Sequence, residues 1–375
     1  MRILVLVHEY PPVGGGGGRV AQDLCRGLVA RGHEVRVLTA HLDGLPEREN
    51  VEGFEVIRLR SGRKLPFKAS LKAMAGYVLA STWAGLRLAR SWRPDVIHVH
   101  FAVPAGPAAL ITSRFTGVPY LLTAHLGDVP GGTPEKTGRW FRWNYPFTPP
   151  IWKSAGAVVA VSEFTRRLAL EHYAVKVQVI PNGVDLRALD PGTIRVGEPP
   201  LIVFAGRFME QKNPLQVVRV LAGLQDLPWR CAMLGDGPLR SEVEAEIDRC
   251  GLRDRFILPG WIQPEEVIGW FRKADILFMP SLSEGLPVTG VQALAMGLAI
   301  VAGKVGGFVD LVEEGKNGYL LEPQDETGFR RSLKQLLSDP RRLNDFRRAS
   351  REYAQQFDLA AVVELYEQIF NGLGK

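Results

Sequence analysis

Two cations follow an apolar run in the second half of the sequence. Arg207 and Lys212 come after residues 201–205 and Gly206, where a buried strand is expected to end. Open α/β sheets bind ligands at the carboxyl ends of their strands. A guanidinium fork and a compact ammonium at that place could together neutralise a diphosphate. Two solvated loop cations are the alternative interpretation.

An acidic residue follows another apolar run further along the chain. Glu284 lies between residues 276–279 and a helical pattern that begins near Pro287. Its carboxylate could accept hydrogen bonds from sugar hydroxyls, and the free N–H groups beyond Pro287 could face phosphate oxygens.

A run of five glycines, residues 14–18, separates the first apolar run from a helix expected from about Arg19. Glycine lets a backbone approach a ligand closely, and a helix start adds positive potential. The run is not a dinucleotide fingerprint, because Arg19 replaces the third glycine and no acidic residue closes the second strand at Thr39. It is not a P-loop either, since no Gly-Lys-Ser/Thr follows. A flexible linker is the alternative to ligand contact.

Strand-like and helix-like patterns alternate along the whole chain, which predicts an α/β fold with parallel sheets. At 375 residues the chain exceeds what one core usually supports, so two domains are expected. A turn cluster and a Pro/Gly-rich stretch place the boundary near residues 180–200. Two doubly wound halves then predict an interdomain cleft. The strand-like runs are residues 3–7, 35–39, 56–59, 96–99, 120–123, 157–161 and 177–180, then 201–205, 231–234, 256–258, 276–279 and 300–302.

Composition favours a cytoplasmic location. Cys25, Cys231 and Cys250 are odd in number and lack metal-ligand spacing, which indicates a reducing compartment. Residues 1–7 have no cleavage-site pattern and are expected to form a buried strand. Lys72 and Arg87 interrupt the longest apolar stretch, which predicts a core-facing helix over residues 71–89.

The net charge of +6 is concentrated in two acid-free stretches. One stretch carries Arg60, Arg63, Lys64, Lys68 and Lys72, and the other interleaves cations with aromatic side chains over residues 136–153. Cations mixed with aromatic residues suit an anionic membrane surface. A solvated face with a self-packed loop is the equal alternative. Nucleic acid is not expected, because no nucleic-acid-binding module accompanies the charge.

The ordered set of motifs resembles retaining glycosyltransferases of the GT-B fold, and most closely glycosyltransferase family 4. The resemblance covers nearly the whole chain. It is carried by the glycines at 14–18, His125, Asn182-Gly183-Val184-Asp185, Gly206-Arg207 with Lys212, Gly235-Asp236-Gly237-Pro238, Glu284 and Gly306-Gly307.

The resemblance implies two Rossmann-like domains, residues 1–185 on the acceptor side and 186–354 on the donor side, with the helix of residues 355–375 crossing back to the first. It implies a hexosyltransferase that retains configuration and moves a sugar from a UDP- or GDP-linked donor to a glycan, lipid-linked or small-molecule acceptor. The expected catalytic residues are Arg207, Lys212, Glu284 and His125. Donor and phosphate contacts are expected from Gly16, Gly17, Gly206, Gly235, Gly285, Leu286, Pro287, Val288 and Gln292, and acceptor-side contacts from Gly14, Gly15 and Asp128, with Asp128 a partner for the acceptor or for His125.

One position departs from the family pattern. Gln292 stands where the family has a second glutamate that holds the ribose, so nucleotide binding is expected to be weaker or altered. No Asp-x-Asp triplet occurs in the sequence, which fits the family's independence of metal and cofactors. Two alternatives remain: a nucleotide-sugar epimerase of the same architecture, and a catalytically weakened relative that binds sugar nucleotides. Contact with the inner face of a membrane is compatible with each.

Overall fold

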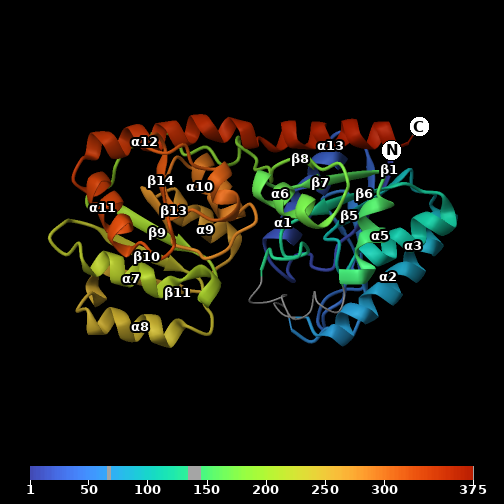
Figure 1. Ribbon diagram of the computed structural model, residues 1–375, viewed down its shortest axis with the longest axis horizontal. Coiled ribbons are helices and arrows are strands. Elements are labelled where there is room, and N and C mark those ends of the chain that lie inside the picture. The colour runs from blue at the N-terminus through green and yellow to red at the C-terminus, as the bar shows by residue number, and fades with distance from the viewer. Residues whose placement is uncertain (66–68, 134–144, 375) are drawn as a thin grey trace. The chain divides into compact units, whose positions relative to one another are not determined.

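The computed structural model describes residues 1–65, 69–133 and 145–374, and the chain divides into two compact units. Unit 1 comprises Met1–Gly183 together with Leu359–Lys375, and unit 2 comprises Val184–Asp358. The sequence analysis predicted the boundaries between the two domains after residues 185 and 354. Each unit has its own helix-covered sheet (Figure 1), which confirms the expected α/β, doubly wound class.

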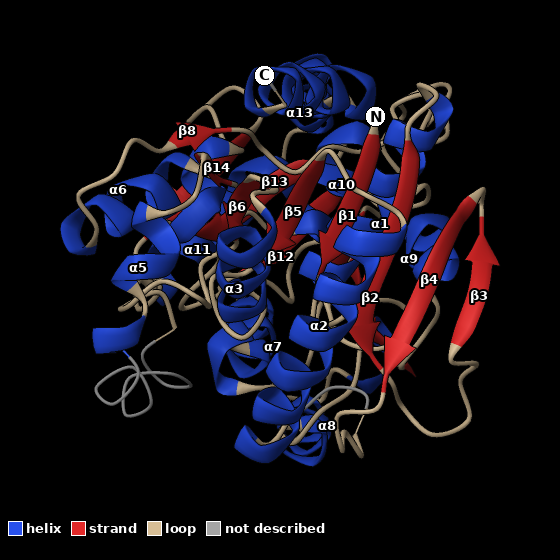
Figure 2. Ribbon diagram, turned by 90° about the vertical axis from the view of Figure 1, so that its right-hand side faces the viewer, coloured by secondary structure: helices blue, strands red, loops and turns tan. Residues whose placement is uncertain are grey.

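Unit 1 holds a sheet in the order β3-β4-β2-β1-β5-β6-β7-β8. All neighbours are parallel except β3 and β4, a pair that lies at one edge (Figure 2). The strands are β1 (Arg2–Leu6), β2 (Glu34–Ala40), β3 (Arg48–Val51), β4 (Phe54–Leu59), β5 (Val96–His100), β6 (Tyr120–Ala124), β7 (Ala157–Ala160) and β8 (Gln178–Val179). The helices are α1 (Gly16–Ala30), α2 (Leu71–Ser91), α3 (Gly106–Thr116), α5 (Pro149–Lys153), α6 (Glu163–His172) and α13 (Leu359–Leu373), with a 3-10 turn at Tyr145–Phe147.

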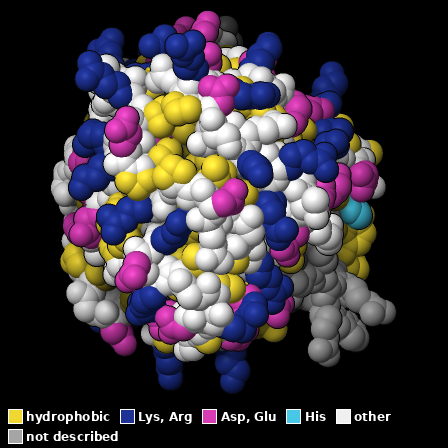
Figure 3. All heavy atoms as spheres, turned by 90° about the vertical axis from the view of Figure 1, so that its left-hand side faces the viewer, with side chains coloured by type: hydrophobic (Ala, Val, Ile, Leu, Met, Phe, Trp, Pro, Cys, Tyr) yellow, Lys and Arg dark blue, Asp and Glu magenta, His cyan; other side chains and the backbone are white. Residues whose placement is uncertain are grey.

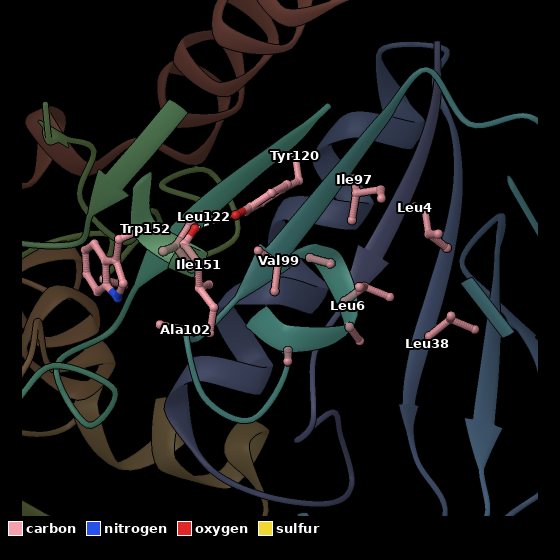
Figure 4. Packing of buried hydrophobic residues seen from close by; sticks show 14 of the residues in the cluster. Leu4, Leu6, Leu38, Ile97, Val99, Ala102, Tyr120, Leu122, Ile151 and Trp152 are labelled. Carbon is pink, nitrogen blue, oxygen red and sulfur yellow. Dashed lines mark hydrogen bonds between the residues drawn. The ribbon is translucent and has the colours of Figure 1, made fainter. Parts of the chain in front are cut away.

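Alternate residues of each strand feed a separate core on either face of this sheet, because successive side chains of a strand point to opposite faces. Ile3 and Val5 pack with α1 and α13, whereas Leu4 and Leu6 pack with α2, α3 and α5. The second core is drawn in Figure 4. The expectation that the last helix serves the first domain matches the observed contact of Val363 with Gly27 of α1.

The helix α5 contains one aromatic residue of the predicted basic aromatic stretch, and that residue is buried. Trp152 belongs to the second core, where its ring is fully buried and stacks on Tyr173 at 4.3 Å. The Tyr120 hydroxyl donates to the carbonyl oxygen of Ile151 within the same core (Figure 4). Trp152 is therefore not a surface aromatic residue. Residues 136–144 of the predicted basic aromatic stretch lie outside the described residues, as does Lys68.

The helix predicted over residues 71–89 is α2, and it is core-facing along one side only. Ala73, Tyr77 and Ala84 are buried, while Leu79 and Trp83 are 74% and 65% exposed. Over the described ranges, no helix has the length and apolar character needed to cross a membrane.

Unit 2 holds a fully parallel sheet in the order β11-β10-β9-β12-β13-β14. The strands are β9 (Leu201–Ala205), β10 (Arg230–Leu234), β11 (Phe256–Gly260), β12 (Ile276–Met279), β13 (Ala299–Gly303) and β14 (Gly318–Leu321). The helices are α7 (Pro214–Ala222), α8 (Arg240–Arg249), α9 (Pro264–Phe271), α10 (Val288–Ala295), α11 (Glu326–Leu337) and α12 (Pro340–Tyr353), with 3-10 turns at Glu210–Lys212, Arg253–Arg255, Gly306–Asp310 and Ala354–Phe357.

The chain leaves unit 1 and returns to it at neighbouring points. A Cβ atom added to Gly183 would lie 2.9 Å from the Cα atom of Leu359, the first residue of α13. Unit 2 is thus one continuous segment inserted between two adjacent residues of unit 1.

Candidate active site

Unit 2 brings together two of the expected catalytic residues, although 72 positions separate them in the chain. Lys212 ends the 3-10 turn that follows β9, and Glu284 lies in the loop that follows the neighbouring strand β12. The Nζ atom of Lys212 lies 2.6 Å from Oε1 of Glu284, and these side chains are only 19% and 6% exposed. The structure therefore forms a largely buried ion pair at the carboxyl ends of adjacent parallel strands.

Hydrogen bonds fasten the loop after β9 to the loop after β12. The Leu282 amide donates to the Gln211 carbonyl oxygen at 2.8 Å, and the Gln211 side-chain amide donates to the Ser283 carbonyl oxygen at 2.9 Å. Both bonds lie within two residues of the ion pair. They fix the backbone on which Lys212 and Glu284 stand.

Gly306 and Gly307 pack directly against the backbone of the loop that follows β12, at Glu284 and Gly285. Gly306 has φ +53°, and a Cβ atom there would lie 1.6 Å from the Glu284 carbonyl oxygen. The Gly307 amide donates to the Gly285 carbonyl oxygen at 2.5 Å. Only glycine permits this approach, because any side chain would overlap the Glu284 backbone.

The other expected contact residues of unit 2 lie after β9, β10 and β12 and in the first turns of α10. Gly206 lies against the Lys212 stem, and a Cβ atom on Gly235 would lie 2.1 Å from the Gly206 carbonyl oxygen. Arg207 follows Gly206 directly and is half-buried. The chain then continues from Glu284 through Gly285 and the buried Leu286 to Pro287, the N-cap of α10. Val288 begins that helix, and Gln292 lies one turn later, half-buried.

The glycine run of unit 1 is mostly helical, which corrects the expected helix start. The helix α1 begins at Gly16, so Gly16, Gly17 and Gly18 form its first turn. Neighbours explain two of these glycines: a Cβ atom on Gly17 would lie 2.4 Å from the Phe101 ring, and one on Gly18 would lie 2.4 Å from the Glu9 carbonyl oxygen. Among the described residues, a Cβ atom on Gly15 would meet nothing within 4 Å, so no close neighbour there explains this glycine.

A buried arginine holds Glu9, the side chain against which Gly14 lies. Gly14 has φ +98° and lies against the Glu9 side chain. Arg63, whose side chain is 0% exposed, donates to Oε1 of Glu9 at 2.9 Å, and its Nη1 lies 3.3 Å from Nδ1 of His8. Burial, and then the Arg63 charge, lower the pKa of His8 to about 3. Arg63 therefore lies neither on a solvated face nor on a surface that could meet a membrane, which were the two interpretations of this basic stretch.

His125 follows β6 and is held on three sides. Its backbone N–H donates to Oδ1 of Asp128 at 2.9 Å, its Nε2 lies 3.0 Å from Nδ1 of His100, and its ring lies 4.4 Å from the Phe101 ring. Phe101 adopts φ +70°, an uncommon conformation for a bulky residue, in making this contact. Burial lowers the pKa of His125 to about 3, so the ring is neutral at physiological pH.

Asp128 is a buried organiser of this loop. Its second oxygen accepts a hydrogen bond from the Ala102 amide at 2.6 Å, and the residue is 1% exposed. Burial raises its pKa to about 6, against the opposing effect of its backbone hydrogen bonds. Of the two roles expected for Asp128, the structure shows the contact with His125; a contact with the acceptor stays a prediction.

Sequence reasoning missed His100, Phe101 and the buried role of Arg63. The sequence His98-Val99-His100-Phe101 gave a signal, because a strand that ends in polar and aromatic residues is a candidate for a site edge. The pairing of His100 with Thr123 across β5 and β6 brings His100 to His125, and strand register was not readable from the motifs. Among the described residues, no group of three or more His, Cys, Asp and Glu side chains could hold a metal ion. Metal independence itself stays a prediction.

Comparisons with known proteins agree with this architecture over the whole chain. Residues 14–188 match the family described as Glycosyltransferase Family 4, and residues 189–356 match Glycosyl transferases group 1. The 2-deoxystreptamine glucosyltransferase of Streptomyces kanamyceticus is 28% identical, over 88% of this chain and 92% of its own. The D-inositol 3-phosphate glycosyltransferase of Xylanimonas cellulosilytica is also 28% identical, over 96% and 94%.

Solved structures show the same fold at lower identity. Sucrose-phosphate synthase from Thermosynechococcus elongatus superposes with a TM-score of 0.86 at 21% identity, covering 99% of both chains. Anabaena HepE in complex with UDP and glucose superposes with a TM-score of 0.78 at 18% identity, covering 99% of this chain and 100% of its own. With two family matches that together span residues 14–356 and a fold shared with these enzymes, the chain belongs to glycosyltransferase family 4 and has the GT-B fold.

Proposed function

We propose that this glycosyltransferase moves a hexose, with retention of configuration and without a metal ion, from a UDP- or GDP-linked donor. The acceptor is a sugar, a glycan, a lipid-linked sugar or another small molecule. The observation that carries the proposal is the Lys212–Glu284 pair, held at 2.6 Å between two loops at strand ends. A cation suited to a diphosphate thus lies beside a carboxylate suited to sugar hydroxyls, and this supports the proposal.

The two charges have complementary tasks in this proposal. An ammonium has three N–H donors, so Lys212 can keep its bond to Glu284 and still donate to a phosphate oxygen. Arg207, five residues earlier, adds a second cation, and fixed cations stabilise the negative charge of a leaving diphosphate. Glu284 keeps one carboxylate oxygen for hydroxyls of the donor sugar.

The proposed chemistry proceeds on one face of the sugar. The bond between the anomeric carbon and the diphosphate breaks while the acceptor oxygen bonds to the same face of that carbon. The departing phosphate takes the acceptor proton, so the products are a nucleoside diphosphate and the glycosylated acceptor. His125 belongs to unit 1, and its ring is neutral and held in place. In this proposal it hydrogen-bonds the transferred sugar.

The similar proteins restrict the choice of donor molecule more than the choice of acceptor molecule. Anabaena HepE is described in complex with UDP and glucose, which favours a UDP-linked hexose. The relatives named above act on 2-deoxystreptamine and on D-inositol 3-phosphate, and both acceptors are polar, hydroxyl-rich rings. A small polyhydroxylated acceptor is therefore tested first. These relatives give no support to the epimerase alternative.

Two experiments test the proposed function in sequence: the first identifies the donor, and the second removes the charge of Arg207. A thermal-shift screen of UDP, GDP and their sugars identifies the donor, because a ligand of the folded state raises the melting temperature. Arg207→Ala is then expected to abolish acceptor-dependent release of nucleoside diphosphate while the circular dichroism spectrum is unchanged. Arg219→Ala is the matched control, since Arg219 lies on α7 with its side chain 54% exposed. Near wild-type turnover of Arg207→Ala refutes the site.

A catalytically weakened relative is the second candidate, favoured by Gln292. Calorimetry separates the two candidates. Donor binding with neither hydrolysis nor transfer, over a panel of acceptors, indicates the weakened relative; release of nucleoside diphosphate that depends on an acceptor indicates the transferase.

We also propose peripheral contact with an anionic membrane on the cytoplasmic side. The surface proposed for this contact is the outer face of α2. Leu79 and Trp83 are exposed there one turn apart, and the exposed Lys72, Arg87 and Arg90 extend the same stripe. The Arg87 guanidinium lies 5.5 Å from the Trp83 ring centroid. No acidic residue occurs from residue 56 to residue 94. On the face in Figure 3, by contrast, basic and acidic side chains are intermixed. Cations around apolar side chains are complementary to anionic lipid.

Vesicle sedimentation tests this contact. The protein is expected to sediment with vesicles that contain phosphatidylglycerol and not with neutral vesicles, and Trp83→Ser is expected to lose most of that binding. Trp261→Ser is the matched control, because Trp261 is 53% exposed in unit 2. Equal loss in both variants, or equal binding to neutral vesicles, contradicts the assignment; a concentration-dependent dimer that Trp83→Ser abolishes would assign the face to a second copy of the chain.

A further inference from the structure

A row of polar side chains crosses the face of the unit 1 sheet that α13 covers. His98 and His100 lie two residues apart on β5 and therefore share one face. Thr123 pairs with His100 across β6, and His125 follows it at the same spacing. His98, His100 and Thr123 are fully buried, so this row runs through a core and not along a surface.

Specific contacts join these side chains into two short chains of bonds. The Tyr366 hydroxyl on α13 lies 3.3 Å from the Thr123 hydroxyl, which lies 2.9 Å from Nε2 of His98. His100 places Nδ1 3.0 Å from Nε2 of His125. The rings of His98 and His100 lie 4.1 Å apart. The contact between His100 and His125 matters most here, because His125 is the residue expected at the transferred sugar.

The hydrogen atom in the His100–His125 contact can be assigned from the surroundings. A neutral imidazole has one N–H donor and one bare nitrogen acceptor. Burial lowers the pKa of both rings, so neither carries two protons near neutral pH. The Nε2 atom of His100 is buried and has no hydrogen-bond partner in the part of the chain that the structure describes. A proton on that atom would be a buried donor without an acceptor, which proteins avoid more strictly than a bare acceptor. The proton of His100 therefore belongs on Nδ1.

From this geometry we propose that His100 is a positioning residue that fixes His125 as its Nδ1–H tautomer. His100 donates from Nδ1 to Nε2 of His125, so the only proton of the His125 ring must be on Nδ1. His125 thereby offers a fixed hydrogen-bond donor to an oxygen of its ligand, a sugar hydroxyl or a phosphate. The role of His125 at the sugar rests on the proposed function, whereas the tautomer does not.

The rest of the loop supports a fixed donor. The carboxylate of Asp128 holds the His125 backbone, and the Phe101 ring lies 4.4 Å from the His125 ring, so the imidazole cannot rotate freely. A donor that is already oriented loses little conformational freedom when the ligand binds. His100 then acts on catalysis through His125, without touching the ligand.

Nitrogen-15 NMR of histidine-labelled protein tests the tautomer without any substrate. Two-bond proton–nitrogen correlations distinguish Nδ1–H from Nε2–H rings, and the spectrum of a His125→Gln variant assigns the His125 signals. We expect wild-type His125 to be the Nδ1–H tautomer. His100→Phe removes the donor and is expected to shift His125 to the Nε2–H tautomer or to a mixture.

Two further variants separate positioning from a structural role. His100→Asn places an amide near the position of Nδ1 and is expected to restore the wild-type tautomer, which also covers the case in which His100→Phe fails to fold. His98→Phe is the matched control, since His98 is equally buried on the same face of β5 but hydrogen-bonds Thr123; His125 is expected to keep its tautomer there.

Turnover gives an independent readout. We expect His100→Phe to lower kcat/KM for the donor about tenfold and His100→Asn to recover most of it, as for one lost oriented hydrogen bond. Wild-type His125 found as Nε2–H, or a tautomer that His100→Phe leaves unchanged, overturns the inference. An Nδ1–H ring in a protein without transferase activity upholds it and counts against the proposed function alone.

Discussion

Replacing Lys212 by methionine isolates the energetic role of the ion pair in unit 2. Methionine keeps much of the apolar stem that packs against Gly206 and removes only the charged end. The Glu284 carboxylate then stays in place, 6% exposed, without its cation. An unpaired buried charge is among the most destabilising changes a protein can undergo.

The structure sets the size of this effect. Removing one partner of a fully buried pair costs about 3–5 kcal/mol. Lys212 is 19% exposed, so water reaches the vacated space and reduces the cost to about 2–3 kcal/mol. Glu284→Gln is expected to cost less, because the more exposed ammonium can turn to solvent. The double variant is expected to be more stable than Lys212→Met alone, with a coupling energy of about 1–3 kcal/mol.

Hydrogen exchange at two backbone amides reports the local stability of this loop. The amides of Leu282 and Gly307 donate across the loops that carry the pair. A loss of 2–3 kcal/mol accelerates their exchange roughly 30- to 150-fold if they exchange by opening of this region. The Phe101 amide, which donates to Thr123 in unit 1, is the internal reference and should not change.

Lys316→Met is the matched control for the charge itself. Lys316 is 68% exposed and lies 3.4 Å from Glu313, so its loss should cost below about 0.5 kcal/mol. Equal exchange in wild type and Lys212→Met, or a double variant less stable than both single variants, would show that the pair does not hold the loop and would refute this reasoning.

Three further predictions follow from single positions. Gly306→Ala is expected to abolish donor binding by calorimetry, because its Cβ atom would overlap the Glu284 backbone. Gly315→Ala is the control: at φ +75° its Cβ atom would meet no described atom within 4 Å, so it should cost only about 1 kcal/mol in urea unfolding and leave binding unchanged. Gln292→Glu is expected to tighten binding of a nucleoside diphosphate about fivefold, since a carboxylate accepts hydrogen bonds from ribose about 1 kcal/mol more strongly than an amide; unchanged affinity would remove Gln292 from the ribose. The pKa of Asp128 is raised to about 6, so the folded state binds a proton that the unfolded state releases at lower pH, and the resulting stability is complete below the unfolded pKa and is lost as pH rises through about 6. In urea unfolding between pH 4.5 and 7, wild type should therefore lose about 2 kcal/mol relative to Asp128→Asn, and parallel profiles would contradict the assignment.

The fold was largely readable from the sequence because fully buried parallel strands are continuous apolar runs. The two strands that were missed show the limit of that signal. The edge strand β3 (Arg48–Val51) is polar and partly exposed, and β14 (Gly318–Leu321) begins with a glycine that fits against the Ile300 backbone. β3 lacks the apolar composition of a core strand, and β14 has only three apolar residues after its glycine, so each strand is specified by its neighbour in the sheet.

The order of the motifs predicted part of the candidate site. The features that depend on packing between distant residues could not be predicted from the sequence. The Lys212–Glu284 pair joins two residues that the family resemblance named. The early start of α1 was unpredictable from propensity, since Gly17 and Gly18 are poor helix formers placed there by the Phe101 ring and the Glu9 backbone. The contact between His100 and His125 depends on register across two strands, which no local pattern encodes.

The adjacency of Gly183 and Leu359 makes the two halves of the enzyme separable by design. Deleting residues 184–358 and closing the gap with a few flexible residues leaves unit 1 with both of its core layers, α13 included. A simple truncation after residue 183 instead strips Tyr366 and Phe370 from that core. Unit 2 is one unbroken stretch, so the sugar-nucleotide binding proposed for it can be tested by titration of the isolated half before any acceptor is known.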